Sequence, residues 1–162
     1  TLLEASYLLH SLPAWFFNPH KRLVKAPKVH LTDTGLAASL TDTTLSTLEE
    51  ERDRLGALLE TFVASELLKQ LTWSETRAVL YHYRLHGGSE VDIVLENRKG
   101  QLVALEVKAT ATPRQDDFKG LKSFMTDVGK RFQCGIVLHT GERVLPFGDR
   151  LWAMPVSSLW DF

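Results

Sequence analysis

Apolar and polar residues alternate along two short runs between Gly87 and Thr110, on either side of the turn Asn-Arg-Lys-Gly at positions 97–100. Two alternating runs joined by such a turn predict a β-hairpin. Because successive side chains of a strand point to opposite faces, the apolar residues are expected on one face and the charges on the other. The apolar positions are Val91, Ile93, Leu95, Val103, Leu105 and Val107, and the charged positions are Glu90, Asp92, Glu96, Glu106 and Lys108.

A helical pattern is strongest between about Leu55 and Leu71, where the apolar residues fall on one stripe of a helical wheel. Glu66 lies inside this stripe, whereas Glu60 lies on its flank, from which it can lean over the edge of the sheet. A bare buried carboxylate costs several kcal/mol, so we expect Arg84 on the following strand to pair with Glu66. The stripe consists of Leu55, Leu58, Leu59, Phe62, Val63 and Leu67.

The rest of the pattern completes an α/β domain. A second amphipathic helix is predicted from Thr112 to Val128, with Pro113 in its first turn. From Leu55 onward the order is helix, three strands, helix and two strands, which indicates a mixed central sheet with helices on both faces. Besides the hairpin, strands are predicted at 81–84, 132–139 and 151–155, a loop at 141–150, and a closing helical turn at 157–162.

The first third of the chain has a different pattern. Residues 1–15 carry apolar residues at helical spacing up to a proline. An irregular, basic stretch then precedes a short strand at 29–31, and Asp33 lies in a turn or caps the next helix. We therefore expect a mainly helical appendage or linker region over residues 1–54 and the main domain over residues 55–162.

The composition fits one globular domain. Of the 162 residues, 44% are hydrophobic, which is enough for a single core. The net charge of −1 gives no overall attraction to nucleic acid, so such binding requires a local patch. Residues 98–131 carry eight Lys or Arg against four Asp or Glu, which is +4. Within them, Arg114, Lys119 and Lys122 are candidate phosphate contacts, although a solvated helix face explains the same charges.

Cysteine content and hydropathy bear on the compartment. The single Cys134 excludes an internal disulfide and a cysteine zinc site, and it fits a reducing cytosol. No apolar run approaches the roughly 18 residues that a membrane span needs, and there is no secretory signal. A cytoplasmic protein without a membrane partner is therefore expected. Because the chain begins with Thr rather than Met, we expect a piece of a longer protein.

Asp92, Glu106 and Lys108 are the residues best suited to chemistry. The hairpin can bring their two carboxylates and one ammonium to one spot. Two carboxylates suit Mg²⁺ or Mn²⁺, which keeps coordination sites open for water and phosphate. A lysine beside them can orient or deprotonate the attacking water. The wet face of an ordinary sheet, or a buried salt-bridge network without a ligand, are alternative interpretations of the same residues.

His82 and His86 are four residues apart, which is a metal-binding interval only on a helix. They bracket a predicted strand and its turn. We therefore expect them to be exposed or hydrogen-bonding histidines and not metal ligands.

The triad resembles the active-site signature of the PD-(D/E)XK nuclease superfamily, with Asp92, Glu106 and Lys108 in the places of its Asp, its Asp or Glu, and its Lys. A Val stands where the signature usually has Pro before the Asp, as in many members. In that superfamily a first-helix Glu often joins the site, within a Gly-x-x-x-Glu pattern that ends at Glu60 in this chain. The resemblance implies Glu60 as a fourth site residue and a restriction-endonuclease-like fold.

Motifs along nearly the whole chain also resemble the C-terminal domain of unknown function in a large family of prokaryotic AAA+ ATPases. They are the run from Pro27 to Leu40, the helix Leu59 to Leu67, and the block from Tyr83 to Lys108. In that family an ATPase domain lies upstream, and this chain contains no Gly-x-x-x-x-Gly-Lys-Ser/Thr phosphate loop. The resemblance therefore implies that ATP acts only through a missing upstream domain.

Two functions are expected from these residues. The first is a magnesium-dependent phosphodiesterase acting on DNA or RNA. Asp92 and Glu106 would hold the metal, with the Val107 carbonyl as a further ligand; Glu60 would be an outer or second-metal ligand, and Lys108 would position water. The alternative is a catalytically inactive module that binds nucleic acid or protein and regulates the attached ATPase. The sequence does not determine the oligomeric state.

Overall fold

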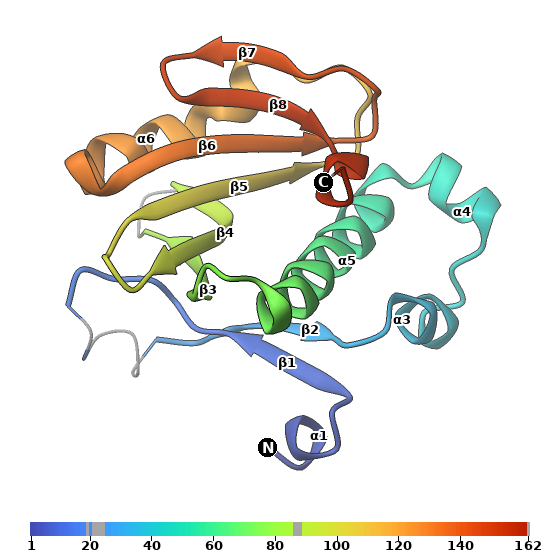
Figure 1. The fold of residues 1–162 in the computed structure, drawn as a ribbon. Coiled ribbons are helices and arrows are strands. Elements are labelled where there is room, and N and C mark those ends of the chain that lie inside the picture. Colours follow the sequence, from blue (N-terminus) through green and yellow to red (C-terminus); the bar gives the residue numbers. More distant parts are fainter. Residues whose placement is uncertain (19, 21–24, 86–88, 162) are drawn as a thin grey trace.

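A six-stranded mixed sheet forms the centre of the molecule (Figure 1). The computed structural model describes residues 1–18, 20, 25–85 and 89–161. Within the sheet, β3, β4 and β5 are antiparallel neighbours, β6 and β8 continue parallel to β5, and β7 is antiparallel to β8. In spatial order the strands are β3 (Ala78–Arg84), β4 (Glu90–Asn97), β5 (Leu102–Lys108), β6 (Phe132–His139), β8 (Leu151–Pro155) and β7 (Leu145–Gly148).

Two helices cover opposite faces of this sheet (Figure 1). The predicted helices are confirmed as α5 (Arg52–Trp73) and α6 (Lys119–Val128). The second begins later than predicted, because residues 112–114 are not helical and the 3-10 turn η1 (Gln115–Phe118) precedes α6. Alternate residues of β5 belong to different cores: Leu102 and Ala104 pack with α6, while Leu105 and Val107 pack with α5. The apolar run at positions 102–105 of β5 therefore reflects burial on both faces, which is typical of strands with parallel neighbours such as β6.

The hairpin turn between β4 and β5 has the predicted chemistry. The side-chain oxygen of Asn97 accepts hydrogen bonds from the backbone N–H groups of Lys99 and Gln101. Gly100 has a φ of +73°, a left-handed conformation that glycine adopts without strain. The local sequence thus determines where the chain reverses.

The expected separation of charged and apolar faces on β4 is wrong in part. Val91 belongs to the core beneath α6, whereas Ile93 belongs to the core beneath α5. The cause is a β-bulge: Tyr81 pairs with Val94 but Tyr83 pairs with Val91, so two residues of β4 oppose one of β3. A bulge reverses the alternation and re-aims the side chains beyond it. The residue re-aimed next to Ile93 is Asp92.

The N-terminal segment is less helical than its apolar spacing predicted. Its helix α1 (Leu2–Ala5) ends before Tyr7, which has a φ of +59°. The chain then forms β1 (Leu9–Leu12), which pairs antiparallel with β2 (Lys28–Leu31) in a separate two-stranded sheet. The helical prediction for residues 1–15 is therefore wrong for β1, because pairing with a distant strand is not visible in local periodicity.

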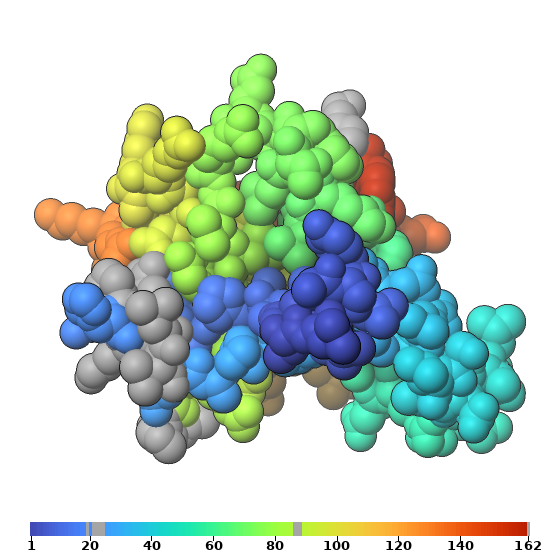
Figure 2. All heavy atoms as spheres, turned by 90° about the horizontal axis from the view of Figure 1, so that it is seen from below, coloured from blue at the N-terminus to red at the C-terminus, as the bar shows by residue number. Residues whose placement is uncertain are grey.

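The same segment closes one edge of the main sheet. Ala14 forms a bridge to His82 of β3, and the Trp15 N–H donates to the His82 carbonyl at 2.7 Å. Figure 2 shows the N-terminal segment, in blue, lying against the green part of the chain that contains α5 and β3. Leu12 enters the core beneath α5 and Trp15 the core beneath α6. Covering the edge of β3 removes a strand edge from solvent.

The remaining elements are short. The strand expected at 29–31 is confirmed within β2, and Asp33 caps the following helix by accepting the Leu36 N–H at 2.6 Å. Part of the predicted loop 141–150 forms the edge strand β7, whose Pro146 is tolerated at a sheet edge. No helix in the described ranges is long and apolar enough to cross a membrane. The other elements are α3 (Thr34–Leu40), α4 (Leu45–Glu50), and the 3-10 turns η2 (Gly129–Arg131) and η3 (Val156–Leu159).

The expected pairing of Glu66 with Arg84 is wrong. Glu66 accepts from Lys69 at 2.5 Å, one turn further along α5, and Arg84 at the exposed end of β3 lies 3.7 Å from Glu90. A partner three residues away on the same helix is reached without fixing two separate elements. Glu66 therefore has no part in the site described below.

Candidate active site

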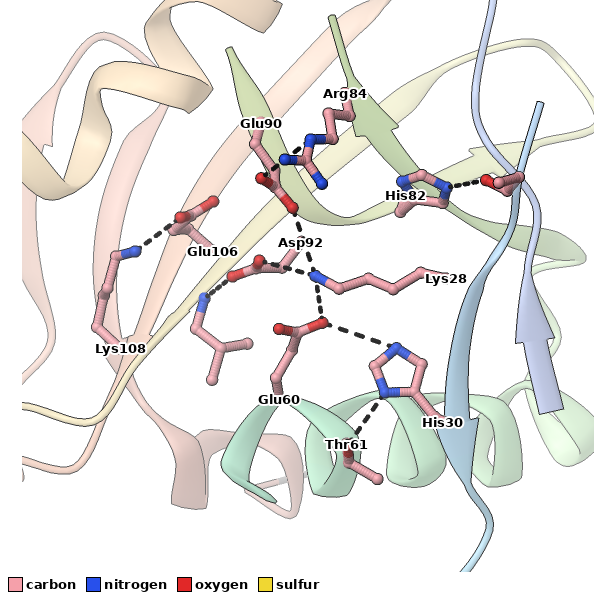
Figure 3. A network of polar contacts seen from close by, with 12 residues as sticks. Lys28, His30, Glu60, Thr61, His82, Arg84, Glu90, Asp92, Glu106 and Lys108 are labelled. Carbon is pink, nitrogen blue, oxygen red and sulfur yellow. Dashed lines mark hydrogen bonds and ion pairs between the residues drawn. The ribbon is translucent and has the colours of Figure 1, made fainter. Parts of the chain in front are cut away.

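Asp92 lies where β4 and β5 separate. The ladder between the two strands runs from Glu96 to Ile93, which pairs with Leu105. Beyond this pair, the Val107 N–H donates to Asp92 Oδ2 at 2.9 Å (Figure 3). A side-chain carboxylate thus takes the place of the next strand carbonyl. The bulge and this hydrogen bond together fix a nearly buried Asp92 in the gap between the strands.

Glu106 lies beside this gap with one free oxygen. Lys108 Nζ donates to its Oε1 at 2.7 Å, whereas its Oε2 is buried and has no hydrogen-bond partner. Burial, and next the negative charge of Asp92, raise the pKa of Glu106 to about 7. An unpaired buried carboxylate oxygen is unfavourable unless a proton or a cation accompanies it. The site is therefore short of positive charge at Glu106.

Lys28 is a member of the site that the sequence did not reveal. Its ammonium, extending from β2, lies 2.6 Å from Glu60 Oε1, 3.4 Å from Asp92 Oδ1 and 3.7 Å from Glu90 Oε1 (Figure 3). Burial lowers the pKa of Lys28, but the three carboxylates outweigh it and the net shift is upward. No sequence signal pointed to Lys28, and only the structure shows that β2 exposes Val29 and buries His30 beside the site.

Glu60 reaches the same cluster from α5. Its side chain is 16% exposed. Burial and the charge of Asp92 raise its pKa, while Lys28 acts in the opposite direction. The structure thus brings Glu60 and Asp92 together around Lys28, and Glu106 together with Lys108 alongside them.

His30 of β2 contacts Glu60 and Thr61 of α5. Its Nδ1 lies 3.1 Å from Thr61 Oγ1 and its Nε2 lies 3.7 Å from Glu60 Oε1 (Figure 3). Its ring also stacks on His10, with 5.6 Å between the ring centroids. Burial lowers the pKa of His30 to about 4. His82 contacts the Ala26 carbonyl at 3.3 Å, which agrees with a hydrogen-bonding histidine. The expectation for His86 lies outside the described residues.

The burial of His30 predicts that the fold loses stability at acidic pH. His30 has a pKa near 4 when folded against an ordinary value of 6.5, so the unfolded chain binds more protons between these values. Stability should then fall as the pH drops from about 6.5 towards 4, and His30 alone would account for roughly 2 kcal/mol between pH 7.5 and pH 5. Urea unfolding at these two pH values should show a smaller loss for His30→Gln than for the wild type. The exposed His20→Gln is the control, and an equal loss in all three proteins would contradict the prediction.

Two hollows open onto the site. One, of about 500 Å³, is lined by residues that include Glu60, Asp92 and Lys108. The other, of about 300 Å³, is lined by four acidic residues and two lysines. Lys108 borders both hollows. The residues of the second hollow are Ser89, Glu90, Glu106, Lys108, Asp116, Asp117, Lys119 and Gly120.

The predicted phosphate contacts lie on the exposed surface of η1 and α6. Lys119 borders the second hollow and pairs with Asp116 at 3.1 Å. Lys122 donates to Gln115 at 2.9 Å, and the backbone N–H of Arg114 donates to Asp117. The three basic side chains are available at the surface, but the acidic residues among them reduce the local positive charge.

A divalent metal fits part of this donor set. Among the described residues, no three His, Cys, Asp or Glu side chains are arranged to hold one ion together. Magnesium, however, takes only one or two carboxylates from a protein and completes its shell with water and phosphate. The free buried Oε2 of Glu106, beside Asp92, is the kind of oxygen that such an ion requires.

Comparisons with known proteins agree with the expected resemblance to a domain of unknown function. The uncharacterized proteins Mb2031c of Mycobacterium bovis and Rv2008c of Mycobacterium tuberculosis are each 27% identical over 157 residues. The match covers 97% of this chain but 34% of either relative, so the chain spans about a third of their length. No solved structure matches.

Two family models match different parts of the chain. Residues 1–47 match a domain of unknown function (DUF8612). The larger match covers residues 55–159, which include most of α5, the whole six-stranded sheet and α6. This second match extends over more than half of the chain. The chain therefore belongs to the family described as domain of unknown function DUF4143.

Proposed function

We propose that this domain is a magnesium- or manganese-dependent phosphodiesterase that cleaves DNA, with a restriction-endonuclease-like arrangement of its site. The observation that carries the proposal is Glu106. Its Oε2 is buried and unpaired, and its raised pKa reflects burial and the nearby charge of Asp92. Such a site stabilises a cation, and a cation is what a phosphodiester needs in order to approach a cluster of carboxylates.

Asp92 and Glu106 would hold the metal, and Glu60 would be an outer ligand. When bound, the metal would polarise the scissile phosphate and neutralise charge that develops on it. The Val107 N–H fixes Asp92 at 2.9 Å, so this carboxylate is oriented before any ligand arrives. A preorganised ligand avoids the cost of ordering it during the reaction.

Lys108 would position the nucleophile. Its ammonium is held 2.7 Å from Glu106 Oε1 and lines both hollows, so it can contact a water that lies between Glu106 and a bound phosphate. The water oxygen would attack phosphorus and give up a proton to bulk water, the bond from phosphorus to the leaving sugar oxygen would break, and that oxygen would take up a proton from bulk water. Arg114, Lys119 and Lys122 would contact flanking phosphates without reading sequence.

One observation favours a second function. The Lys28 ammonium already lies among Glu60, Asp92 and Glu90, at 2.6, 3.4 and 3.7 Å. A carboxylate cluster that is neutralised from within is what a catalytically inactive module would retain. In that case the domain would bind nucleic acid or protein and regulate an ATPase domain carried upstream on the same chain.

Calorimetric titration with Mn²⁺ and Mg²⁺, together with cleavage of labelled single- and double-stranded DNA, tests the proposal. The wild type should bind Mn²⁺ at millimolar concentration or below and cleave DNA only with metal. Glu106→Gln should weaken binding roughly tenfold or more, because it removes a charged ligand. Exposed Glu142→Gln is the matched control and should behave as wild type. Absence of both metal binding and cleavage would exclude the nuclease hypothesis and favour the regulatory module. Cleavage of RNA but not DNA would show that RNA is the substrate.

A further inference from the structure

Three carboxylates, of Glu60, Glu90 and Asp92, form a carboxylate cluster. Among the described residues, Lys28 is the one cation at its centre. It contacts carboxylates from two elements, Glu60 of α5 and Asp92 and Glu90 of β4. It comes from neither of them, because it is the first residue of β2, which lies outside the six-stranded sheet. The lysine therefore bridges the N-terminal segment to the site.

An ammonium and a divalent ion compete for these oxygens. Magnesium needs carboxylate oxygens at about 2.1 Å, and the Lys28 nitrogen lies 2.6 Å from Glu60 Oε1 and 3.4 Å from Asp92 Oδ1. A dication placed on the same oxygens would lie within a few ångströms of a positive charge in a poorly hydrated site, where repulsion is strong. The two cations cannot occupy the cluster together in this arrangement.

The side chain is able to leave. Lys28 is 26% exposed, so its ammonium has a route to solvent, and its four-carbon stem can redirect the head while the β2 backbone stays paired with β1. Next to the cluster lies a hollow of about 520 Å³ that Lys28 and Glu90 both line. The ammonium can therefore withdraw from Glu60 and Asp92 without unfolding the segment.

We propose that Lys28 is an internal competitor of the metal: its ammonium pairs with Asp92, a proposed metal ligand, and with Glu60, the proposed outer ligand, and a divalent ion binds fully only when the ammonium is displaced. This inference rests on the metal site of the proposed function. The N-terminal segment would then set the metal affinity of a site whose other members all come from the main domain. A phosphate drawn to the displaced ammonium would favour the metal-bound state.

Metal titration of Lys28→Met tests the competition. Mn²⁺ affinity measured by calorimetry should rise at least about tenfold, since a unit positive charge leaves the ligand set. Lys28→Arg keeps the charge and should bind Mn²⁺ no more tightly than wild type. Lys25→Met, an exposed lysine of the same segment, is the matched control and should not change the affinity. Equal affinity in wild type and Lys28→Met would overturn the proposal.

A measurement on the wild type covers the case in which Lys28→Met fails to fold. Lysine-selective methylation followed by mass spectrometry should show Lys28 becoming more reactive when Mn²⁺ is added, with Lys25 unchanged. Unchanged reactivity of Lys28 at a metal concentration that saturates the site would overturn the inference, even if DNA is cleaved. Tighter Mn²⁺ binding by Lys28→Met without any DNA cleavage would support the inference and remove the proposed activity instead.

Discussion

Replacement of Asp92 by asparagine is expected to lower metal-dependent DNA cleavage roughly a thousandfold while leaving the fold intact. The asparagine side-chain oxygen can still accept the Val107 N–H that now donates to Asp92 at 2.9 Å, so β4 and β5 should remain joined. The negative charge, however, is lost at the centre of the site. Without it, a cation bound at Glu106 would have one carboxylate in place of two.

Single-turnover cleavage with saturating Mn²⁺ measures this effect, and thermal unfolding checks the fold. Asp149→Asn is the control, since the Asp149 side chain is 84% exposed on the β7–β8 turn and pairs with its neighbour Arg150 at 3.2 Å. It should cleave as the wild type does. Cleavage by Asp92→Asn within about tenfold of wild type would show that Asp92 is not a metal ligand, and the loss of folded protein would show a structural role.

Truncation of Trp15 to alanine is expected to reduce the free energy of unfolding by about 3–5 kcal/mol. Trp15 is 0% exposed, and its ring packs against Tyr83 of β3 and Phe124 of α6 at centroid distances of 6.1 and 5.4 Å. Its Nε1 also donates to Glu96 Oε2 at 3.1 Å. The change would therefore leave a cavity in the core beneath α6 and remove one of the hydrogen bonds of Glu96.

Urea unfolding measures this loss of stability. It also tests whether the N-terminal segment stabilises the main domain. If residues 55–162 were stable alone, a change at position 15 would have little effect on them. Trp73→Ala is the control, because Trp73 at the end of α5 is 67% exposed and should change stability by no more than about 0.5 kcal/mol. A similarly small effect for Trp15→Ala would show that the N-terminal segment is only loosely attached.

Much of the main sheet was predictable from local pattern. The strands at 132–139 and 151–155 have the observed bounds, and the hairpin and both amphipathic helices occur as expected. In each case the apolar spacing of 5 to 20 neighbouring residues was sufficient, because burial of one face decides the conformation. The short N-terminal strand β1 was missed for the converse reason: its partner β2 lies some 20 residues away in the chain.

The residues of the candidate site also divide into those that the sequence predicted and those that only the structure revealed. Asp92, Glu106 and Lys108 were chosen by residue type and spacing, and Glu60 through the resemblance to a nuclease superfamily. Their assignment to a metal remains a prediction. Lys28 was not chosen, since its contacts with Glu60 and Asp92 span 32 and 64 positions of sequence. No local pattern encodes such a contact. The bulge at Asp92 is equally invisible, because it depends on how β3 and β4 are registered.

The sequence by itself determined most strands and helices of the main domain, and which acidic and basic residues are near the central hairpin. The tertiary structure alone decided that the Val107 N–H fixes Asp92 in the gap between two strands, and that an ammonium from β2 lies among the carboxylates. The physical reason is the separation along the sequence over which each interaction acts. Hydrophobic periodicity acts between neighbours in sequence, whereas charge pairing and strand register act between groups that only folding brings together.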